Sequence, residues 1–267
     1  MIPARKRWGQ HFLASGETAL RIVEAARVLP SDTVVEVGPG EGALTRPLAR
    51  RVRRLLAIEI DPLRAAALEE EFAGDPRVRI ARGDALDRSF GGWLREVGWE
   101  GPAVLVANLP YNAATPILQA AIVEPEAIAR SLVTVQREVA QRLCARPGDD
   151  GYGYLSVRVA AFAQARILFD LPQGAFRPRP KVFSSVVALT PRIPQLDPAR
   201  RERALALASL GFRSRRKTLA NALAAEGARA RWEGALDAMG KSRKARAEEL
   251  SLEEYLRLAE IIEAKSA

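Results

Sequence analysis

Short β-branched segments alternate with helix-like segments from residue 31 to residue 192, and this alternation constrains the fold more than any other feature. Five segments have the apolar pattern of buried strands: residues 33–37, 55–60, 77–81, 103–107 and 131–135. Strands joined by helical crossovers pair in parallel and need helices on both faces of their sheet. The pattern therefore predicts an α/β fold with a mostly parallel sheet.

Two further strands are expected at residues 167–171 and 183–189. A proline-rich loop separates them, which predicts an antiparallel edge. After residue 190 a linker contains three prolines: Pro191, Pro194 and Pro198. Helical sequence follows at residues 200–212, 215–225 and 251–264. We expect a large domain at residues 1–190 and a small all-helical domain at residues 191–267.

The 267-residue chain carries a net charge of +9 and has a sequence pI of about 10.3. Such an excess of positive charge indicates a polyanionic partner, but it does not distinguish RNA, DNA and a membrane surface. The single cysteine, Cys144, and the single histidine, His11, allow neither an internal disulfide nor a Cys/His metal cluster. We therefore expect no metal and no need for an oxidising compartment.

Residues 101–123 carry no charge and are long enough to span a bilayer. Polar and proline residues that lipid disfavours interrupt the segment: Asn108, Pro110, Asn112 and Pro116. We interpret it as a buried strand, a polar turn and a helix. No uninterrupted apolar stretch follows the basic residues near the N-terminus, so we expect a cytoplasmic protein without a membrane partner.

Gly38, Gly40 and Gly42 follow the first predicted strand and precede helical sequence. Glycines at such a position let the backbone turn sharply and let a ligand approach a helix N-terminus. Acidic residues end the next two strands, where Glu59 suits two ribose hydroxyls and Asp84 suits an adenine amino group. Together these residues predict an adenosine pocket. The alternative is a structural turn followed by two helix caps.

Asn108, Leu109, Pro110 and Tyr111 follow the fourth predicted strand. Methylation of a base amino group needs acceptors for its N–H groups and a flat surface for the extracted base. Asn108 offers a side-chain oxygen, Leu109 a backbone carbonyl and Tyr111 a ring for stacking. Pro110 stiffens the turn without adding a donor. The alternative is an ordinary turn at the end of a strand.

With these residues the sequence resembles the ribosomal RNA adenine N6,N6-dimethyltransferases, which use S-adenosylmethionine. The resemblance covers nearly the whole chain, at residues 5–13, 36–42, 59, 84–85, 108–111, 176–182 and 213–221. It implies a Rossmann-like class I methyltransferase domain at residues 1–190, whose first 30 residues close over the cofactor. It also implies that the helical domain at residues 191–267 binds RNA.

The resemblance implies that S-adenosylmethionine contacts Gln10, His11, Leu13, Gly38, Gly40, Glu59, Ile60, Asp84, Ala85 and Asn108. Many relatives have Asn at the position of His11, so a backbone contact is expected there. The implied catalytic residues are Asn108, Leu109, Pro110, Tyr111 and Phe176. Phe176 would stack on the face of the adenine opposite Tyr111, and the alternative is a core aromatic beneath a proline-rich loop.

Basic residues gather in three of these segments and are candidates for RNA contacts: Arg5, Lys6, Arg7, Arg177, Arg179, Lys181, Arg213, Arg215, Arg216 and Lys217. Guanidinium and ammonium groups near a base pocket can hold phosphates. For the last four of these residues, the alternative is a solvated helix face.

The resemblance implies dimethylation of the N6 amino groups of two adjacent adenosines near the 3′ end of small-subunit rRNA. We expect a monomer that acts on a pre-ribosomal particle in ribosome biogenesis. Alternatives are methylation of another RNA, such as large-subunit rRNA, and a mainly non-catalytic assembly role. A DNA adenine methyltransferase would more often have Asp-Pro-Pro-Tyr. A nicotinamide dehydrogenase is disfavoured because the glycine spacing is G-x-G-x-G rather than G-x-G-x-x-G.

Overall fold

The computed structural model describes residues 9–214 and 216–264. The chain forms two compact units, one of residues up to 140 with Ala165–Pro191, the other of Gln141–Gln164 with residues from 192 onward. The first unit ends for the second time at Pro191, close to the boundary expected at residue 190. The sequence analysis did not foresee that Gln141–Gln164 belongs with the helical residues.

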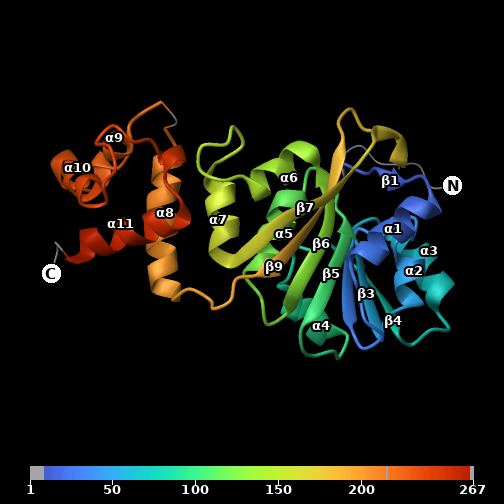
Figure 1. Ribbon diagram of the computed structural model, residues 1–267. Coiled ribbons are helices and arrows are strands. Elements are labelled where there is room, and N and C mark those ends of the chain that lie inside the picture. Colours follow the sequence, from blue (N-terminus) through green and yellow to red (C-terminus); the bar gives the residue numbers. More distant parts are fainter. Residues whose placement is uncertain (1–8, 215, 265–267) are drawn as a thin grey trace. The chain divides into compact units, whose positions relative to one another are not determined.

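The first unit contains a seven-stranded sheet with the order β4-β3-β2-β5-β6-β9-β7 (Figure 1). Its strands are β2 (Thr33–Val37), β3 (Arg54–Glu59), β4 (Val78–Arg82), β5 (Ala103–Asn108), β6 (Ile128–Gln136), β7 (Ala163–Leu171) and β9 (Ser184–Pro191). Strands β2 to β6 pair in parallel, and β9 pairs antiparallel with β6. The predicted fold class, a mostly parallel sheet with an antiparallel edge, is confirmed.

The helices of this part of the chain are α1 (Gly16–Ala25), α2 (Thr45–Ala49), α3 (Pro62–Phe72), α4 (Phe90–Glu96), α5 (Ala114–Ile122) and α6 (Arg137–Cys144). Asp61 caps α3 by accepting from the backbone N–H of Leu63, and Pro62 occupies the first turn. Proline fits there because its missing N–H would have no helical partner. The cap fixes where α3 leaves the carboxyl end of β3.

The central strands are apolar along their whole length because helices cover both faces of a parallel sheet. Val34 and Val35 on β2, Leu55 and Leu56 on β3, and Leu105 on β5 have no exposed surface. The chain runs from β2 outward to β4 and then returns to β5 on the other side of β2. This reversal creates a switch point between β2 and β5, where open α/β sheets bind ligands at the carboxyl ends of their strands.

A second, two-stranded sheet lies outside the main one. Strand β1 (Phe12–Leu13) pairs antiparallel with β8 (Phe176–Arg177). This pairing joins the N-terminal segment to the proline-rich loop that precedes β9. The sequence analysis did not predict it, since strands of two residues show no periodicity.

Apart from the first two residues of β7, the described residues of the second unit form helices and loops. Its remaining helices are α7 (Tyr154–Phe162), α8 (Pro198–Phe212), α9 (Leu219–Ala222), α10 (Arg229–Ala238) and α11 (Leu252–Ala264). Tyr152 and Val157 are buried in one apolar core with Trp232 and Tyr255, which explains why the segment before β7 belongs here. Buried phenol groups find partners, and the Tyr255 hydroxyl donates to the carbonyl of Ala247 at 2.9 Å.

Two helix predictions for this unit need correction. The helix expected at residues 215–225 is wrong, because only Leu219–Ala222 is α-helical and its start is set by Thr218, which accepts from the backbone N–H of Asn221. Helix α10 was not expected at all. The last helix is confirmed, with the predicted capping box between Ser251 and Glu254. No helix in the described ranges is both long and apolar enough to cross a membrane.

Leu105 at the centre of β5 provides a test of this packing. Leu105→Ala is expected to lower the free energy of unfolding by about 2–5 kcal/mol, because it removes buried methyl groups and leaves a cavity. Leu29→Ala is the control, since Leu29 is 57% exposed, and it should change the stability little. Urea unfolding followed by tryptophan fluorescence and circular dichroism measures both. Equal losses in the two variants would contradict the assigned core.

Candidate functional site

The glycine loop after β2 lies at the switch point of the sheet. Gly38 and Gly40 have φ angles of +68° and +58°, which side-chain-bearing residues rarely adopt. A Cβ atom on Gly40 would lie 2.6 Å from Cε1 of Phe12. The N-terminal segment therefore packs directly on the glycine backbone, and a larger residue at Gly40 would displace it.

Glu59 ends β3, and its side chain joins this strand to the glycine loop and to the start of α3. One carboxylate oxygen accepts from the backbone N–H of Gly40 at 2.9 Å, and the other accepts from that of Asp61 at 2.8 Å. The side chain is buried, and desolvation raises its pKa despite the two hydrogen bonds. Each oxygen keeps a second lone pair, so the predicted contact with ribose hydroxyls is compatible with this geometry.

Asp84 follows β4 and caps its own turn. Its carboxylate accepts from the backbone N–H of Leu86 at 3.0 Å. It does not cap a helix as the alternative expected, because α4 begins at Phe90 and Ser89 is its cap. Ala85 is buried, and its carbonyl accepts from the indole of Trp93. Ile60 and Leu86 follow the adjacent strands β3 and β4 and are 40% and 42% exposed. An exposed apolar residue after each strand suits a flat base, and the sequence analysis named only Ile60.

Asn108 ends β5, and its carboxamide is held in one orientation. Its Nδ2 group donates to the carbonyl of His11 at 2.8 Å. A carbonyl accepts only, so the opposite atom, Oδ1, is an acceptor, and it is buried without a hydrogen-bond partner among the described residues. The next residue, Leu109, is anchored through its backbone N–H to the carbonyl of Thr134 at 3.1 Å. Pro110 continues the turn, and its carbonyl accepts from Ala113.

Tyr111 is held at the tip and on one face of its ring. Its hydroxyl lies 2.5 Å from Oγ of Ser184, the first residue of β9. The imidazole of His11 stacks on the ring with a centroid distance of 4.9 Å and an interplanar angle of 28°. Burial raises the pKa of the phenol, so Tyr111 stays neutral at physiological pH.

Phe176 occupies a different place from the one predicted. Its side chain is 2% exposed and lies in the apolar core of the first unit with Leu171 and Val186. The backbone of Phe176 pairs with that of Leu13 in the two-stranded sheet. In this arrangement Phe176 offers no face to a base, and the core alternative describes its position. The exposed aromatic residue of the same loop is Phe183, at 47%.

Among the other residues expected at the cofactor, Gln10 and Leu13 are half-buried in the N-terminal segment. Phe12 between them lies against Arg64, whose guanidinium carbon is 4.0 Å from the ring centroid. Arg64 is 2% exposed and contacts Glu41 at 3.3 Å. A buried guanidinium over an aromatic face stabilises the segment above the glycine loop. No sequence signal distinguished Arg64 from a surface arginine.

Glu36 begins the segment 36–42 that carries part of the resemblance, but the sequence analysis did not name it as a site residue. It lies on β2 and is 1% exposed, and among the described residues its Oε2 atom has no partner at hydrogen-bond distance, although the Thr45 side chain lies close enough to lower its pKa. Together with Phe12, Gly38 and Asn108 it lines a small cavity. Burial raises its pKa from 4.5 to about 8. Two residues with a buried acceptor oxygen, Glu36 and Asn108, therefore line one cavity. The signal available in the sequence was an acidic residue inside an otherwise apolar strand.

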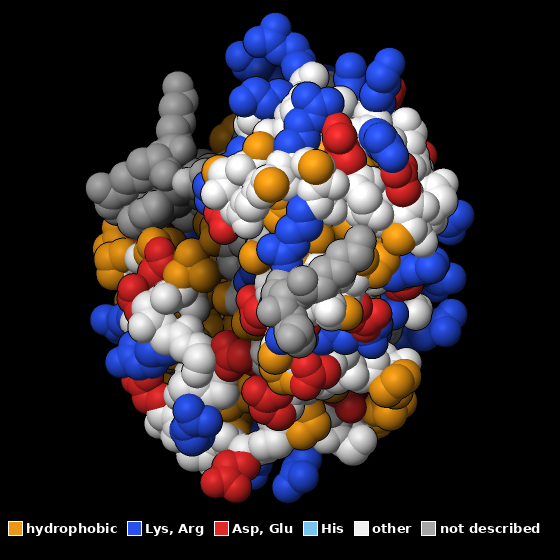
Figure 2. Space-filling model, turned by 90° about the vertical axis from the view of Figure 1, so that its left-hand side faces the viewer, with side chains coloured by type: hydrophobic (Ala, Val, Ile, Leu, Met, Phe, Trp, Pro, Cys, Tyr) orange, Lys and Arg blue, Asp and Glu red, His pale blue; other side chains and the backbone are white. Residues whose placement is uncertain are grey.

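The predicted RNA contacts fall into three groups. Arg5, Lys6, Arg7 and Arg215 lie outside the described residues. Arg177 is exposed at the end of β8, and Arg179 and Lys181 are exposed in the loop between β8 and β9. Arg213, Arg216 and Lys217 are exposed after α8. Figure 2 shows Lys and Arg side chains gathered toward the top of one face of the molecule, with Asp and Glu among them.

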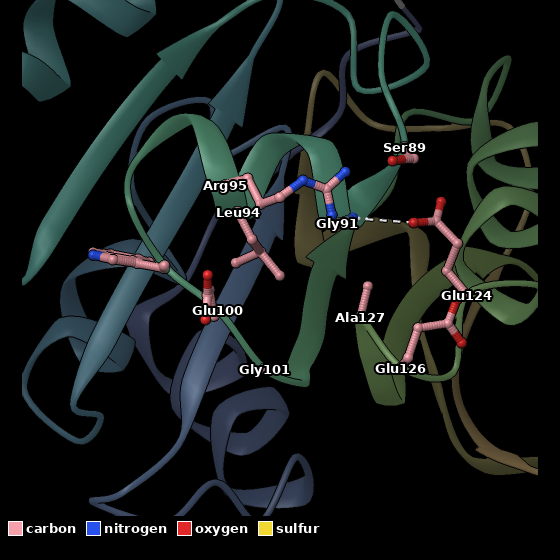
Figure 3. A pocket seen from close by; sticks show the side chains of 10 residues that line it. Ser89, Gly91, Leu94, Arg95, Glu100, Gly101, Glu124, Glu126 and Ala127 are labelled. Carbon is pink, nitrogen blue, oxygen red and sulfur yellow. Dashed lines mark hydrogen bonds between the residues drawn. The ribbon is translucent and has the colours of Figure 1, made fainter.

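Another cavity, of about 400 Å³, lies near the start of β5 and so away from the carboxyl ends of the strands. Figure 3 shows Glu124 reaching the backbone of Gly91, and the carboxylate also accepts from Phe90, at 3.0 and 3.1 Å. Glu124 thus satisfies the free N–H groups at the start of α4, which is a structural role. No group of three His, Cys, Asp or Glu residues suited to a metal ion occurs in the described part of the chain.

The sheet with its switch point, the glycine loop and the Asn-Leu-Pro-Tyr turn define a Rossmann-like protein with a small cavity at the switch point. A family model described as "Ribosomal RNA adenine dimethylase" matches residues 1–264, and the chain belongs to that family. Its sequence is 42% identical over 260 residues to the "Ribosomal RNA small subunit methyltransferase A" of Methylococcus capsulatus, covering 96% of each chain.

Solved structures agree with this assignment. The crystal structure of the 23S rRNA methyltransferase ErmE is 31% identical, with a TM-score of 0.73, and the match covers 94% of this chain and 99% of that one. A dimethyladenosine transferase from Plasmodium falciparum has a TM-score of 0.78 at 22% identity, over 93% and 96% of the two chains. At that identity the second match supports the fold alone.

The buried carboxyl of Glu36 predicts a pH-dependent stability. Between 4.5 and about 8 the unfolded chain releases this proton while the folded chain keeps it, so this carboxyl lowers the stability as the pH rises. The free energy of unfolding of Glu36→Gln is expected to rise relative to that of the wild type from about pH 5 to about pH 8. The pH slope of this difference corresponds to at most one bound proton. Urea unfolding across this range measures it, with exposed Glu100→Gln as the control. Parallel curves for wild type and Glu36→Gln would contradict a raised pKa.

Proposed function

We propose that this chain is an S-adenosylmethionine-dependent adenine-N6,N6-dimethyltransferase of small-subunit rRNA. Its substrate would be two adjacent adenosines near the 3′ end of that RNA, in a pre-ribosomal particle. Family membership and the name of the 42% identical relative support the substrate. The observation that carries the chemistry is the buried Oδ1 atom of Asn108, oriented by the bond of Nδ2 to His11.

The residues at the switch point fit the proposed cofactor. When bound, S-adenosylmethionine supplies an electrophilic methyl group on a positively charged sulfur, and it also carries an ammonium group. N–H donors need acceptors, and Glu36 and Asn108, which line one cavity, each have a buried oxygen that can accept. Glu59 would hold the ribose, and Ile60, Asp84 and Ala85 would flank the adenine. Gly38 and Gly40 would allow close approach of the backbone.

The catalytic turn would bind and orient the target adenine. Asn108 Oδ1 and the Leu109 carbonyl would accept from the exocyclic amino group, which directs the nitrogen lone pair toward the methyl group. The neutral ring of Tyr111 would hold the base by stacking. As the N–C bond forms, the bond between the methyl carbon and the sulfur would break, which leaves S-adenosylhomocysteine as the product. The adenine nitrogen is then acidic, and its proton would pass to water. Positioning and fixed dipoles therefore account for the catalysis.

The exposed basic residues would hold the RNA. Arg177, at the end of β8, and Arg179 and Lys181, in the loop directly before β9, are close in sequence to Ser184, the partner of Tyr111. Arg213, Arg216 and Lys217 belong to the helical unit, for which we propose a role in RNA binding. We further propose that the protein acts as a monomer in the cytoplasm, during ribosome biogenesis.

A second candidate is the methylation of large-subunit rRNA. The 31% identical solved structure is a 23S rRNA methyltransferase, and the resemblance includes the whole fold. The two functions differ in the modified nucleotide and not in the chemistry. Mapping methylated adenosines in both ribosomal subunits, with and without this protein, distinguishes them.

Asn108→Ala tests the proposed chemistry. It is expected to lower methyl transfer by about a hundredfold, since one preorganised polar contact to the reacting group is lost. The measurement uses labelled S-adenosylmethionine and immature small subunits, followed by mapping of the modified nucleotides. Gln195→Ala removes an exposed carboxamide and should retain full activity. Full activity in Asn108→Ala would refute the assigned role of this turn.

A further inference from the structure

His11 is the residue at which the N-terminal segment meets the catalytic turn and the late loop. It directly precedes β1, and its backbone carbonyl accepts from Nδ2 of Asn108. Its Nδ1 atom lies 2.6 Å from the carbonyl of Pro178. Because a carbonyl only accepts, Nδ1 carries the proton and donates. One residue thus contacts the segments on both sides of the proposed base site.

The imidazole ring itself lies against Tyr111. The centroid distance of 4.9 Å and the angle of 28° describe an offset stack. The hydrogen bond to Pro178 fixes the imidazole, and the contact of Tyr111 with Ser184 fixes the tip of the phenol ring. The tilt of the tyrosine ring is therefore set from two sides.

We propose that His11 is a positioning residue for the target adenine, which acts through Tyr111 rather than through the cofactor. The inference rests on the proposed function and assigns the histidine side chain to the substrate side of the site. The backbone carbonyl of His11 orients Asn108, while the imidazole packs against the ring of Tyr111. Holding a stacking platform in place before the base arrives lowers the ordering cost of productive binding.

Two substitutions of His11 each keep one of its two side-chain contacts and remove the other. Asparagine can donate to the Pro178 carbonyl but has no ring to stack on Tyr111. Phenylalanine can stack but cannot donate. The two substitutions therefore separate the hydrogen bond from the ring contact, and both keep the backbone carbonyl that holds Asn108.

Activity measurements test the proposal first. His11→Asn is expected to lower the rate of methyl transfer about tenfold, and His11→Phe less than about threefold, because a displaced reacting group reduces the rate steeply. Both should keep the affinity for S-adenosylmethionine, measured by calorimetry, within about twofold. In a Tyr111→Ala background the His11 substitutions should have no further effect, as expected for two residues that act as a unit. Arg21→Met is the control, since it removes the contact of another side chain with an aromatic ring, that of Phe169.

Three results would overturn the proposal. A loss of cofactor affinity parallel to the loss of rate would assign the imidazole to the cofactor. An undiminished effect in the Tyr111→Ala background would show that it does not act through the tyrosine. Tighter RNA binding by His11→Asn would show that the imidazole occupies the place of the base and must leave.

A readout without catalysis separates this inference from the proposed function. The chain has four tyrosines, so 3-fluorotyrosine labelling gives four signals, and Tyr111→Phe identifies that of Tyr111. His11→Asn should shift this signal alone, whereas His11→Phe should preserve most of the ring-current effect. No shift of the Tyr111 signal would overturn the His11–Tyr111 contact, even in an active enzyme. A wild-type protein that methylates no rRNA, with the shift present, would refute only the proposed function.

Discussion

The carboxylate of Glu59 is the interaction on which the site depends. It is buried at the end of β3 and accepts from two backbone N–H groups, one in the glycine loop and one at the start of α3. A buried carboxylate without such partners would carry a large desolvation cost. The two bonds therefore fix the glycine loop after β2 relative to the turn after β3. On that fixed base rest Gly40, the ring of Phe12 above it, and the cavity that Glu36 and Asn108 line.

Much of this arrangement could be predicted from the sequence because it follows from periodicity and from strand ends. The continuous apolar segments predicted the central strands within a few residues. Glycines and acids that follow parallel strands meet at one edge, so Gly40, Glu59 and Asn108 were expected together, and they do lie in one region. Capping chemistry located the start of α3 and of α11 for the same reason, since it depends on neighbours along the chain.

The parts that could not be predicted depend on contacts between distant segments. The local sequence around Phe176 is the same whether its ring faces a base or the core. Its burial in the core depends on how distant segments pack together. The role of Gln141–Gln164 in the helical unit depends on which core accepts Tyr152 and Val157. The raised pKa of Glu36 reflects burial on both faces of β2, and the sequence alone shows only an acid in an apolar strand.

The pairing of β1 with β8 affects the order in which the parts of the molecule fold. His11 and Pro178, beside that pairing, are 167 residues apart in the chain. During synthesis the N-terminal segment has no strand partner until nearly two-thirds of the protein has been made. Closing so long a loop is slow and gains nothing until the sheet beneath it exists. The glycine loop and the apolar strands can form early from contacts closer in sequence, whereas the base site can assemble only as one of the last events of folding.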